Sequence, residues 1–162
     1  MKIYQFVLAT ILIVGTYGCT TSIESRHSFD ARTDFSTLAS YNWLPYKEDY
    51  FSTPASAKHF RSAIDNLFEK KGFKLNSDAP DFLIETTRVE TYREKYLSVY
   101  GTIVFPKAMI RVNLRDAKSG SVIYESVADA YYGKEDIPQE KKNTVIDRSV
   151  ELLLSGFPPE SE

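Results

Sequence analysis

Residues 108–132, with the sequence AMIRVNLRDAKSGSVIYESVADAYY, decide the fold of this chain. From Ala108 to Arg115, apolar and polar residues alternate, and this period of two is typical of a strand with one buried and one solvated face. Residues 116–120 (DAKSG) form a turn sequence with glycine at its end. Residues 121–132 are again rich in β-branched and aromatic residues, so the whole stretch predicts an antiparallel hairpin.

Further extended segments surround this hairpin. Residues 82–89 and 97–105 are rich in β-branched and aromatic residues and predict two more strands. Pro106 separates the second of these from the strand at residues 108–115. Upstream, residues 29–46 contain two short extended pieces, and aromatic residues alternate on one face of the second. These aromatic residues are Tyr41, Trp43 and Tyr46.

Two helices are predicted on either side of the strands. The first begins at Thr53-Pro54, because a capping residue followed by proline favours a helix start, and it ends at Gly72. Its apolar residues recur at steps of three and four, which predicts one buried face. They are Phe60, Ala63, Ile64, Leu67 and Phe68. The second helix runs from about Pro138 to Ser155, and Gly156 with the following prolines ends it.

Together these elements predict an α+β fold. We expect a single two-layer domain with a mostly antiparallel or mixed β-sheet and two helices packed on one face. The domain spans residues 29–159, and residues 160–162 form a C-terminal tail. A domain of this length can bury a sufficient core without disulfides. None can form within the chain, because Cys19 is its only cysteine.

The N-terminal residues have the order of a secretory signal peptide. Lys2 is followed by an apolar run, residues 3–14, and then by the sequence GTYG, which leads into Cys19. A membrane-spanning helix needs about 20 predominantly apolar residues, whereas this run is roughly half that length and contains polar residues. We therefore predict a signal peptide at residues 1–18.

Cys19 directly follows the small residue Gly18, which resembles the cleavage site of bacterial lipoproteins, where the cysteine receives a diacylglyceryl group. The resemblance implies lipidation of Cys19 and supplies the two acyl chains that stable anchoring in a membrane needs. Residues 19–28 then comprise the lipidated cysteine and a short polar tether, TTSIESRHS. Thr20 stands where aspartate would favour retention in the inner membrane. The resemblance therefore implies a protein of the bacterial cell envelope, anchored to the outer membrane and facing the periplasm.

Charge and motif content argue against several functional classes. The formal net charge is −2, and lysine and arginine form no patch suited to phosphates, so nucleic-acid binding is not expected. His27 and His59 lack the close spacing to other ligands that a zinc site shows, and His59 is expected to be solvated at the edge of the first helix. No phosphate-loop, dinucleotide or nucleophile-elbow motif occurs. We therefore predict no catalytic residue, cofactor or metal.

One polar segment is rich in tyrosine. Tyr92, Tyr96 and Tyr100 lie within residues 91–100, and Tyr131 closes the next long strand. Tyrosine has an apolar body and a polar tip, and it is favoured where a protein contacts a partner or a membrane surface. The first interpretation is a hairpin whose tyrosines cover the open face of the sheet. The alternative is that these four tyrosines form a contact surface for another envelope component.

Five motifs occur in a characteristic order. They are Tyr41-Asn42-Trp43, Lys71-Gly72-Phe73, Pro80–Ile84 (PDFLI), Asp116–Tyr124 (DAKSGSVIY) and Phe157-Pro158-Pro159. This order resembles the bacterial envelope lipoproteins of the domain of unknown function 4136 family, over nearly all of the chain after the leader. The sequence departs from the family pattern at Tyr124, where tryptophan is expected. The resemblance implies a small α+β lipoprotein domain without an established activity, and it transfers no catalytic residue.

Three functional hypotheses follow, in order of preference. The first is a non-enzymatic envelope lipoprotein that binds or scaffolds a partner protein through a tyrosine-bearing surface. The second is a periplasmic carrier of a small apolar or lipid ligand, which needs a cavity between the helices and the sheet. The third is a hydrolase with a dispersed site, which requires His59 near a serine or aspartate in a cleft.

Overall fold

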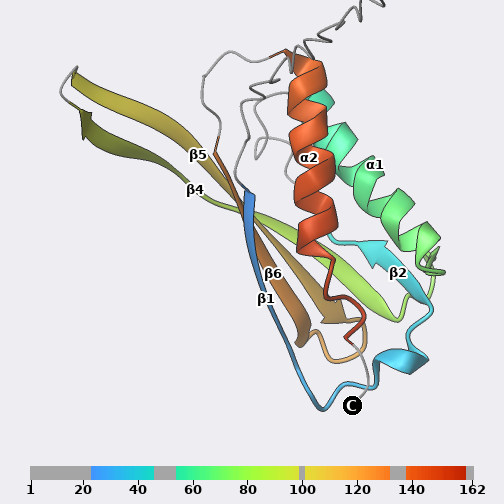
Figure 1. Ribbon diagram of the computed structural model, residues 1–162. Coiled ribbons are helices and arrows are strands. Elements are labelled where there is room, and N and C mark those ends of the chain that lie inside the picture. The colour runs from blue at the N-terminus through green and yellow to red at the C-terminus, as the bar shows by residue number, and fades with distance from the viewer. Residues whose placement is uncertain (1–22, 46–53, 99–100, 132–137, 160–162) are drawn as a thin grey trace, which may run out of the picture.

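The structure, a computed structural model (Figure 1), describes residues 23–45, 54–98, 101–131 and 138–159. Its strands and helices are β1 (Ile23–Phe29), β2 (Ser40–Trp43), α1 (Pro54–Lys70), β3 (Lys74–Leu75), β4 (Phe82–Ser98), β5 (Gly101–Asp116), β6 (Val122–Tyr131) and α2 (Gln139–Leu153), with a short 3-10 helix at Phe35–Thr37. The strands form one six-stranded sheet in the order β1-β6-β5-β4-β2-β3.

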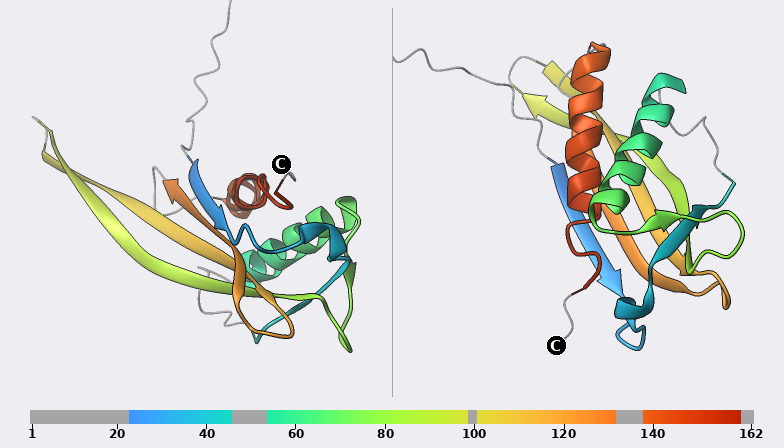
Figure 2. Two further views of the ribbon diagram at one scale, coloured as in Figure 1. Left: turned by 90° about the horizontal axis from the view of Figure 1, so that it is seen from below. Right: turned by 90° about the vertical axis from the view of Figure 1, so that its right-hand side faces the viewer.

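The sheet is mixed. The pairs β1–β6, β6–β5 and β5–β4 are antiparallel, whereas β4–β2 and β2–β3 are parallel. Parallel strands need a crossover connection, and α1 lies on the path from β2 to β3 and β4. Figures 1 and 2 show that both helices lie on the same face of the sheet. The predicted α+β fold, with two helices on one face of a mixed sheet, is therefore confirmed.

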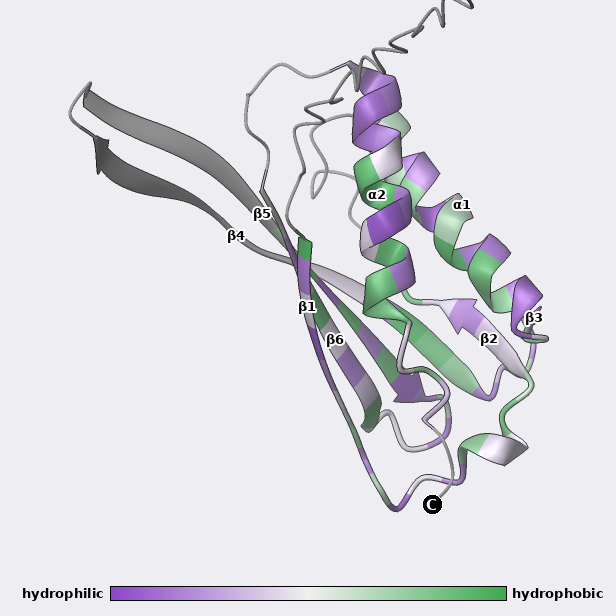
Figure 3. Cartoon of the chain, in the orientation of Figure 1, coloured by the Kyte–Doolittle hydropathy of each residue, from purple (hydrophilic) through white to green (hydrophobic). Residues whose placement is uncertain are grey.

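Alternate positions along the strands separate the core from the open face, as the sequence of β5 predicts. Ile84 pairs with Leu114 and Leu114 with Tyr124, so one row crosses three strands, and all three side chains are fully buried. The neighbouring row contains Glu85 paired with Asn113, and it lies on the face away from the helices. Figure 3 shows the alternation as bands of hydrophobic and hydrophilic residues along the strands.

Aromatic rings fill the space between the helices and the sheet. Phe68 of α1 lies with its ring centroid 5.0 Å from that of Tyr41, 5.6 Å from those of Phe73 and Phe82, and 5.8 Å from that of Phe157. Phe68 and Phe82 have no exposed surface, and Phe157 is 1% exposed. Edge-to-face contacts of this kind stabilise a core beyond the burial of area alone.

Both predicted helices are confirmed in type and position. α1 begins at Pro54 and ends at Lys70, and Gly72 follows with φ +92°, a backbone conformation that glycine adopts without strain. α2 begins after Pro138 and ends at Leu153, close to the predicted bounds.

The structure corrects the predicted tether. Residues 23–28 do not form a flexible polar segment but most of β1, which pairs with β6 from Ile23↔Ala130 to Phe29↔Tyr124. β1 is an edge strand, and four of its last five residues are exposed, so its sequence shows no alternation of apolar and polar residues. Backbone pairing with β6, rather than a buried face, defines this strand.

The structure also corrects the predicted strands at residues 82–89, 97–105 and 108–115. These segments form two long strands: β4 pairs with β5 from Phe82↔Asp116 to Ser98↔Gly101. Pro106 lies within β5 and does not separate two strands. It pairs with Arg93 of β4.

Candidate functional site

The sheet continues into a two-stranded arm, which we define as Tyr92–Ser98 of β4 and Gly101–Lys107 of β5. These residues pair with each other from Tyr92↔Lys107 to Ser98↔Gly101. Among the described residues, the pairing of β4 with β2 extends only to Ile84, and the pairing of β5 with β6 extends only to Lys107. Figures 1 and 2 show the arm projecting away from the rest of the domain, which we call the body.

A register shift separates the arm from the body. The regular pairing of β4 with β5 is interrupted between Val89 and Tyr92. An extra residue in one strand bends it and increases its twist. The shift therefore explains why β4 and β5 curve away from the body at this point (Figure 1).

The register places two of the predicted contact tyrosines in one row. Tyr92 pairs with Lys107, and Lys107 pairs with Tyr131, so this row crosses the root of the arm. Tyr96 pairs with Ile103 farther out along the arm. Tyr100 and the predicted lipidation site Cys19 lie outside the described residues. The contact surface and the lipidation both stay predictions.

The outer part of the arm differs in composition from its root. Residues 96–98 (YLS) and 101–105 (GTIVF) carry no charge, and we call these two segments the tip. The charged residues lie between the tip and the body: Arg93, Glu94 and Lys95 on β4 and Lys107 on β5. An isolated pair of strands is only marginally stable in water, so a ribbon of this kind is suited to packing against another surface.

The open face of the body has a different character. Glu85 accepts hydrogen bonds at one oxygen from Asn113 Nδ2 and Arg115 Nε, both at 2.9 Å. These bonds, first that of Asn113, hold the pKa of the Glu85 carboxyl below its ordinary value. Beside them, Arg111 Nε lies 3.8 Å from a carboxylate oxygen of Glu125. On this part of the face, each carboxylate therefore lies beside an arginine, and the amide of Asn113 donates to Glu85.

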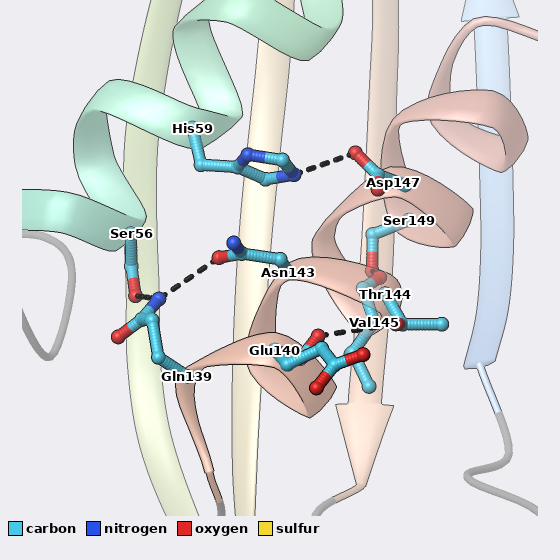
Figure 4. Close-up of polar contacts among 9 residues, drawn as sticks. All are labelled: Ser56, His59, Gln139, Glu140, Asn143, Thr144, Val145, Asp147 and Ser149. Atoms are coloured by element: carbon cyan, nitrogen blue, oxygen red, sulfur yellow. Dashed lines mark hydrogen bonds and ion pairs between the residues drawn. The ribbon is translucent and has the colours of Figure 1, made fainter.

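His59 lies in a polar contact between the two helices (Figure 4). Its Nε2 atom is 2.8 Å from Oδ1 of Asp147, and the two side chains are 32% and 53% exposed. The prediction of a solvated His59 is therefore wrong: the ring is partly buried and has a carboxylate partner on α2. The two residues lie 88 positions apart, and no local pattern could have joined them before the packing of α1 against α2 was known.

The same interface contains a buried serine. Ser56 is 2% exposed, and its Oγ accepts a hydrogen bond of 3.1 Å from Gln139 Nε2. Gln139 also donates to Asn143 Oδ1 at 2.9 Å (Figure 4). Here the amide of Gln139 donates to the Ser56 hydroxyl, and the polar network joins α1 to α2.

The motif Tyr41-Asn42-Trp43 has a structural role. Trp43 Nε1 and the Tyr41 hydroxyl both donate to Oδ1 of Asp65 on α1, at 2.8 and 3.0 Å. Burial and then the nearby Asp65 charge raise the pKa of Tyr41 far above its ordinary value. Arg61 lies on α1, as Asp65 does, and its guanidinium is 5.0 Å from the centre of the Trp43 ring. This motif therefore fixes α1 on β2.

The Pro80–Ile84 motif holds the start of β2. Asp81 Oδ2 accepts hydrogen bonds from the backbone N–H groups of Ala39 and Ser40, at 3.0 and 2.9 Å, and from the Ser40 hydroxyl at 2.8 Å. These bonds lower the pKa of Asp81. Asp116 acts similarly in the β5–β6 turn, where its carboxylate accepts from the Ser119 N–H, and Gly120 has φ +71°.

The C-terminal motif packs against the sheet. The Tyr124 hydroxyl donates to the carbonyl oxygen of Leu153 at 2.8 Å, and burial raises the pKa of Tyr124 to about 12. The His27 ring of β1 stacks on Tyr124 with centroids 6.0 Å apart. A Cβ atom on Gly156 would lie 2.5 Å from the His27 ring, so this close approach requires glycine.

Neither a metal site nor a membrane-spanning helix occurs among the residues that the structure describes. There, no three histidine, cysteine, aspartate or glutamate side chains gather as ligands for a metal ion. Within the same ranges, neither helix has the length and apolar character that crossing a membrane requires.

Comparison with known proteins identifies the family. The family model described as a domain of unknown function (DUF4136) matches residues 25–159. No curated protein matches the chain.

Several solved structures share the fold. A PDZ domain protein from Parabacteroides distasonis is 16% identical, with a TM-score of 0.58, and the match covers 88% of this chain but only 38% of that protein. The PelC dodecamer from Paraburkholderia phytofirmans is 11% identical, with a TM-score of 0.57, and the match covers 86% of this chain and 100% of that one. A minor lipoprotein from Acinetobacter baumannii is 14% identical, with a TM-score of 0.46 and 74% and 91% coverage. For the first two structures, at 16% and 11% identity, the likeness is one of fold.

Proposed function

This chain belongs to the DUF4136 family of domains of unknown function, and we propose that it is a non-enzymatic lipoprotein of the bacterial envelope that binds or scaffolds another envelope component. In this proposal Cys19 is the anchor, and the arm is the part of the molecule that makes the contact. The anchor places the domain at the periplasmic face of the outer membrane, because Thr20 replaces the aspartate expected for retention in the inner membrane.

The arm is the single observation that supports this proposal most directly. Its two strands have no further strand partner beyond Lys107 and Ile84 among the described residues, and its tip is uncharged. Open strand edges are templates for pairing with other molecules, and proteins usually shorten, charge or cover them. An arm of this composition is therefore better suited to a contact than to free exposure to water.

The packing of the core favours a binding module over a carrier. A carrier would need a cavity between the helices and the sheet. In this chain Phe60, Phe68, Phe82 and Leu153 occupy that space with no exposed surface, and the Phe68 ring contacts four other aromatic rings.

The anchor is tested by the intact mass of full-length protein that is expressed with its leader and extracted from membranes in mild detergent. We expect a chain that begins at Cys19 and carries acyl chains. A chain that begins elsewhere, or an unmodified Cys19, would overturn the anchored form of the proposal.

The contact role of the arm is tested in cells by a photo-crosslinking amino acid at Tyr96, with Leu75 as the matched control position. Leu75 is a large apolar residue, 59% exposed, on the short edge strand β3. We expect a discrete adduct at Tyr96 and none at Leu75, and mass spectrometry of the adduct distinguishes a protein partner, a second copy and a lipid. Equal labelling at the two positions would contradict the proposal.

A further inference from the structure

We infer that the tip of the arm rests on the same bilayer that holds the acyl chains of Cys19, so that the domain has two membrane contacts. This inference rests on the proposed lipid anchor and names the envelope component that the arm contacts. The two contacts would fix the orientation of the body relative to the membrane, which a single lipidated residue cannot do.

The chain between the anchor and the body is short. β1 begins at Ile23, four residues after Cys19. Four residues span at most about 14 Å, because a fully extended chain advances by about 3.3–3.6 Å per residue. The start of β1 is therefore held close to the bilayer surface. Because residues 23–28 belong to β1 and not to the tether, the distance that the tether can span is shorter than the sequence predicts.

The start of β1 and the root of the arm lie at the same end of the sheet. Ile23 pairs with Ala130, and Ala130 pairs with Ala108, which adjoins Lys107 at the root of the arm. Neighbouring strands lie about 4.8 Å apart, so two steps across the sheet separate the start of β1 from β5 by about 10 Å. Figure 1 shows the arm leaving the body beside this end of β1.

The arm is long enough to reach the membrane from this root. Each of its strands contains seven residues, Tyr92–Ser98 and Gly101–Lys107. At about 3.3 Å per residue the arm extends over about 23 Å. The arm is therefore longer than the stretch of chain that links Cys19 to β1. Since the root of the arm lies near the bilayer surface, the tip can reach that surface.

The composition of the arm suits a lipid surface. The tip offers Tyr96, Leu97 and the run Ile103–Phe105, and tyrosine and phenylalanine with aliphatic residues are favoured at the boundary between headgroups and acyl chains. Behind the tip, Arg93, Lys95 and Lys107 outnumber Glu94 by three cations to one anion. Cations next to an apolar segment are attracted to anionic phospholipid headgroups.

The turn between β5 and β6 lies at the opposite end of the body and has none of these properties. Its sequence, DAKSGS, is polar, and Lys118 within it is exposed. This turn follows β5, the strand that forms one side of the arm, and therefore supplies a matched control position at the opposite end of that strand.

The test uses the full-length lipoprotein with a single environment-sensitive fluorophore, either on Ser98→Cys at the tip or on Lys118→Cys at the control turn. Acylation consumes the thiol of Cys19, so each variant carries one reactive cysteine. The protein is reconstituted into vesicles of phosphatidylethanolamine and phosphatidylglycerol that contain a spin-labelled lipid. We expect the emission at position 98 to shift to shorter wavelength and to be quenched by the spin-labelled lipid, and the emission at position 118 to remain that of an aqueous probe.

A charge variant sharpens this test. The double substitution Lys95→Glu and Lys107→Glu is expected to weaken the quenching at position 98, and more so in vesicles with phosphatidylglycerol than in vesicles of neutral phosphatidylcholine. Equal quenching with and without the substitutions in both lipids would contradict the role of the cations.

The other outcomes separate the inference from the proposed function. Quenching at position 98 no greater than at position 118 overturns the membrane contact, while an adduct of Tyr96 with a protein in cells would leave the binding role in place. A shift at position 98 that depends on protein concentration and not on lipid indicates a second copy and also overturns the inference. Two fluorophores per chain indicate a free Cys19, in which case the proposed anchor and the inference both fail.

Discussion

The body and the arm are built from the same two strands and differ in what surrounds them. Within the body, β4 lies between β2 and β5, and β5 lies between β4 and β6, with the aromatic core beneath them. Beyond Tyr92 and Lys107, the described residues of the two strands pair with each other and with no other described strand. The same two strands are therefore part of the sheet of the body over one half of their length and form a projecting two-stranded arm over the other.

The difference extends to the motifs. The residues that carry the family resemblance lie in the body and join one element to another. Trp43 donates to Asp65 of α1, and Asp81 accepts from the start of β2. Gly156, next to the last motif, lies against the His27 ring of β1. Of the tyrosines considered for a contact surface, Tyr92 and Tyr96 lie on the arm and Tyr131 lies beside its root. These motifs therefore specify the fold, and membership of the family does not specify what a particular member contacts.

The largest effect is expected from removing the centre of the body. Phe68→Ala deletes a fully buried ring that contacts four other rings, and such substitutions cost about 3–5 kcal/mol. We expect a large fall in the urea midpoint, followed by the fluorescence of Trp43. A loss below about 1 kcal/mol would show that this part of the core is loosely packed.

A smaller loss is expected at the contact between α1 and β2. Asp65→Ala removes the acceptor of Trp43 Nε1 and of the Tyr41 hydroxyl, and each buried donor left without a partner costs about 1–3 kcal/mol. Asp65→Asn keeps one acceptor oxygen and is the matched control, with a smaller expected loss. Equal urea midpoints for the two variants would contradict the assigned role of the carboxylate.

The seam between β1 and the C-terminal segment is tested at Gly156. Gly156→Ala places a methyl group against the His27 ring, and overpacking of this kind costs about 1–3 kcal/mol. The double variant with His27→Ala should recover part of that loss, because the obstructing ring is gone. Simple additivity of the two substitutions would mean that the glycine is required for another reason.

The buried hydroxyl of Tyr124 predicts a pH dependence of the body. An unfolded tyrosine ionises near pH 10, whereas burial raises the pKa of Tyr124 to about 12, so the free energy of unfolding falls as the pH rises between these values. Tyr124→Phe should cost about 1 kcal/mol at neutral pH through its lost bond to Leu153 and should make the alkaline decline shallower. Tyr41, whose pKa is also raised, retains part of the decline. Urea titrations at neutral and alkaline pH measure both effects.

The smallest effect on stability is expected in the arm. Tyr96→Ser should change the free energy of unfolding of the body by less than about 0.5 kcal/mol, because Tyr96 lies beyond the register shift, where β4 pairs with β5 alone among the described strands. The backbone amides of the arm should exchange with deuterium faster than those of β5 between Val112 and Leu114, which have strands on both sides. Protection of the arm equal to that of the body in the free protein would contradict the distinction between the two regions.

The sequence predicts those parts of the fold whose signal is local. The alternation around Val112, the helical stripe through Phe68 and the turn ending at Gly120 each lie within one element, and all three are confirmed. β1 lacks such a signal because pairing at an edge places little demand on side chains, and the hairpin between β4 and β5 lacks a typical turn sequence. The hydrogen bond between His59 and Asp147 depends on how two helices pack, which no periodicity within either helix specifies.

The position of β1 has a consequence for how the protein matures. The hydroxyl of Ser126 donates to the carbonyl oxygen of Arg26 at 3.1 Å, across 100 positions of the chain. Non-local pairings of this kind form late in folding, because a long loop must close first. The N-terminal strand β1 is therefore synthesised long before its partner, and it stays unpaired until residue 130 has been made and the long loop between them closes.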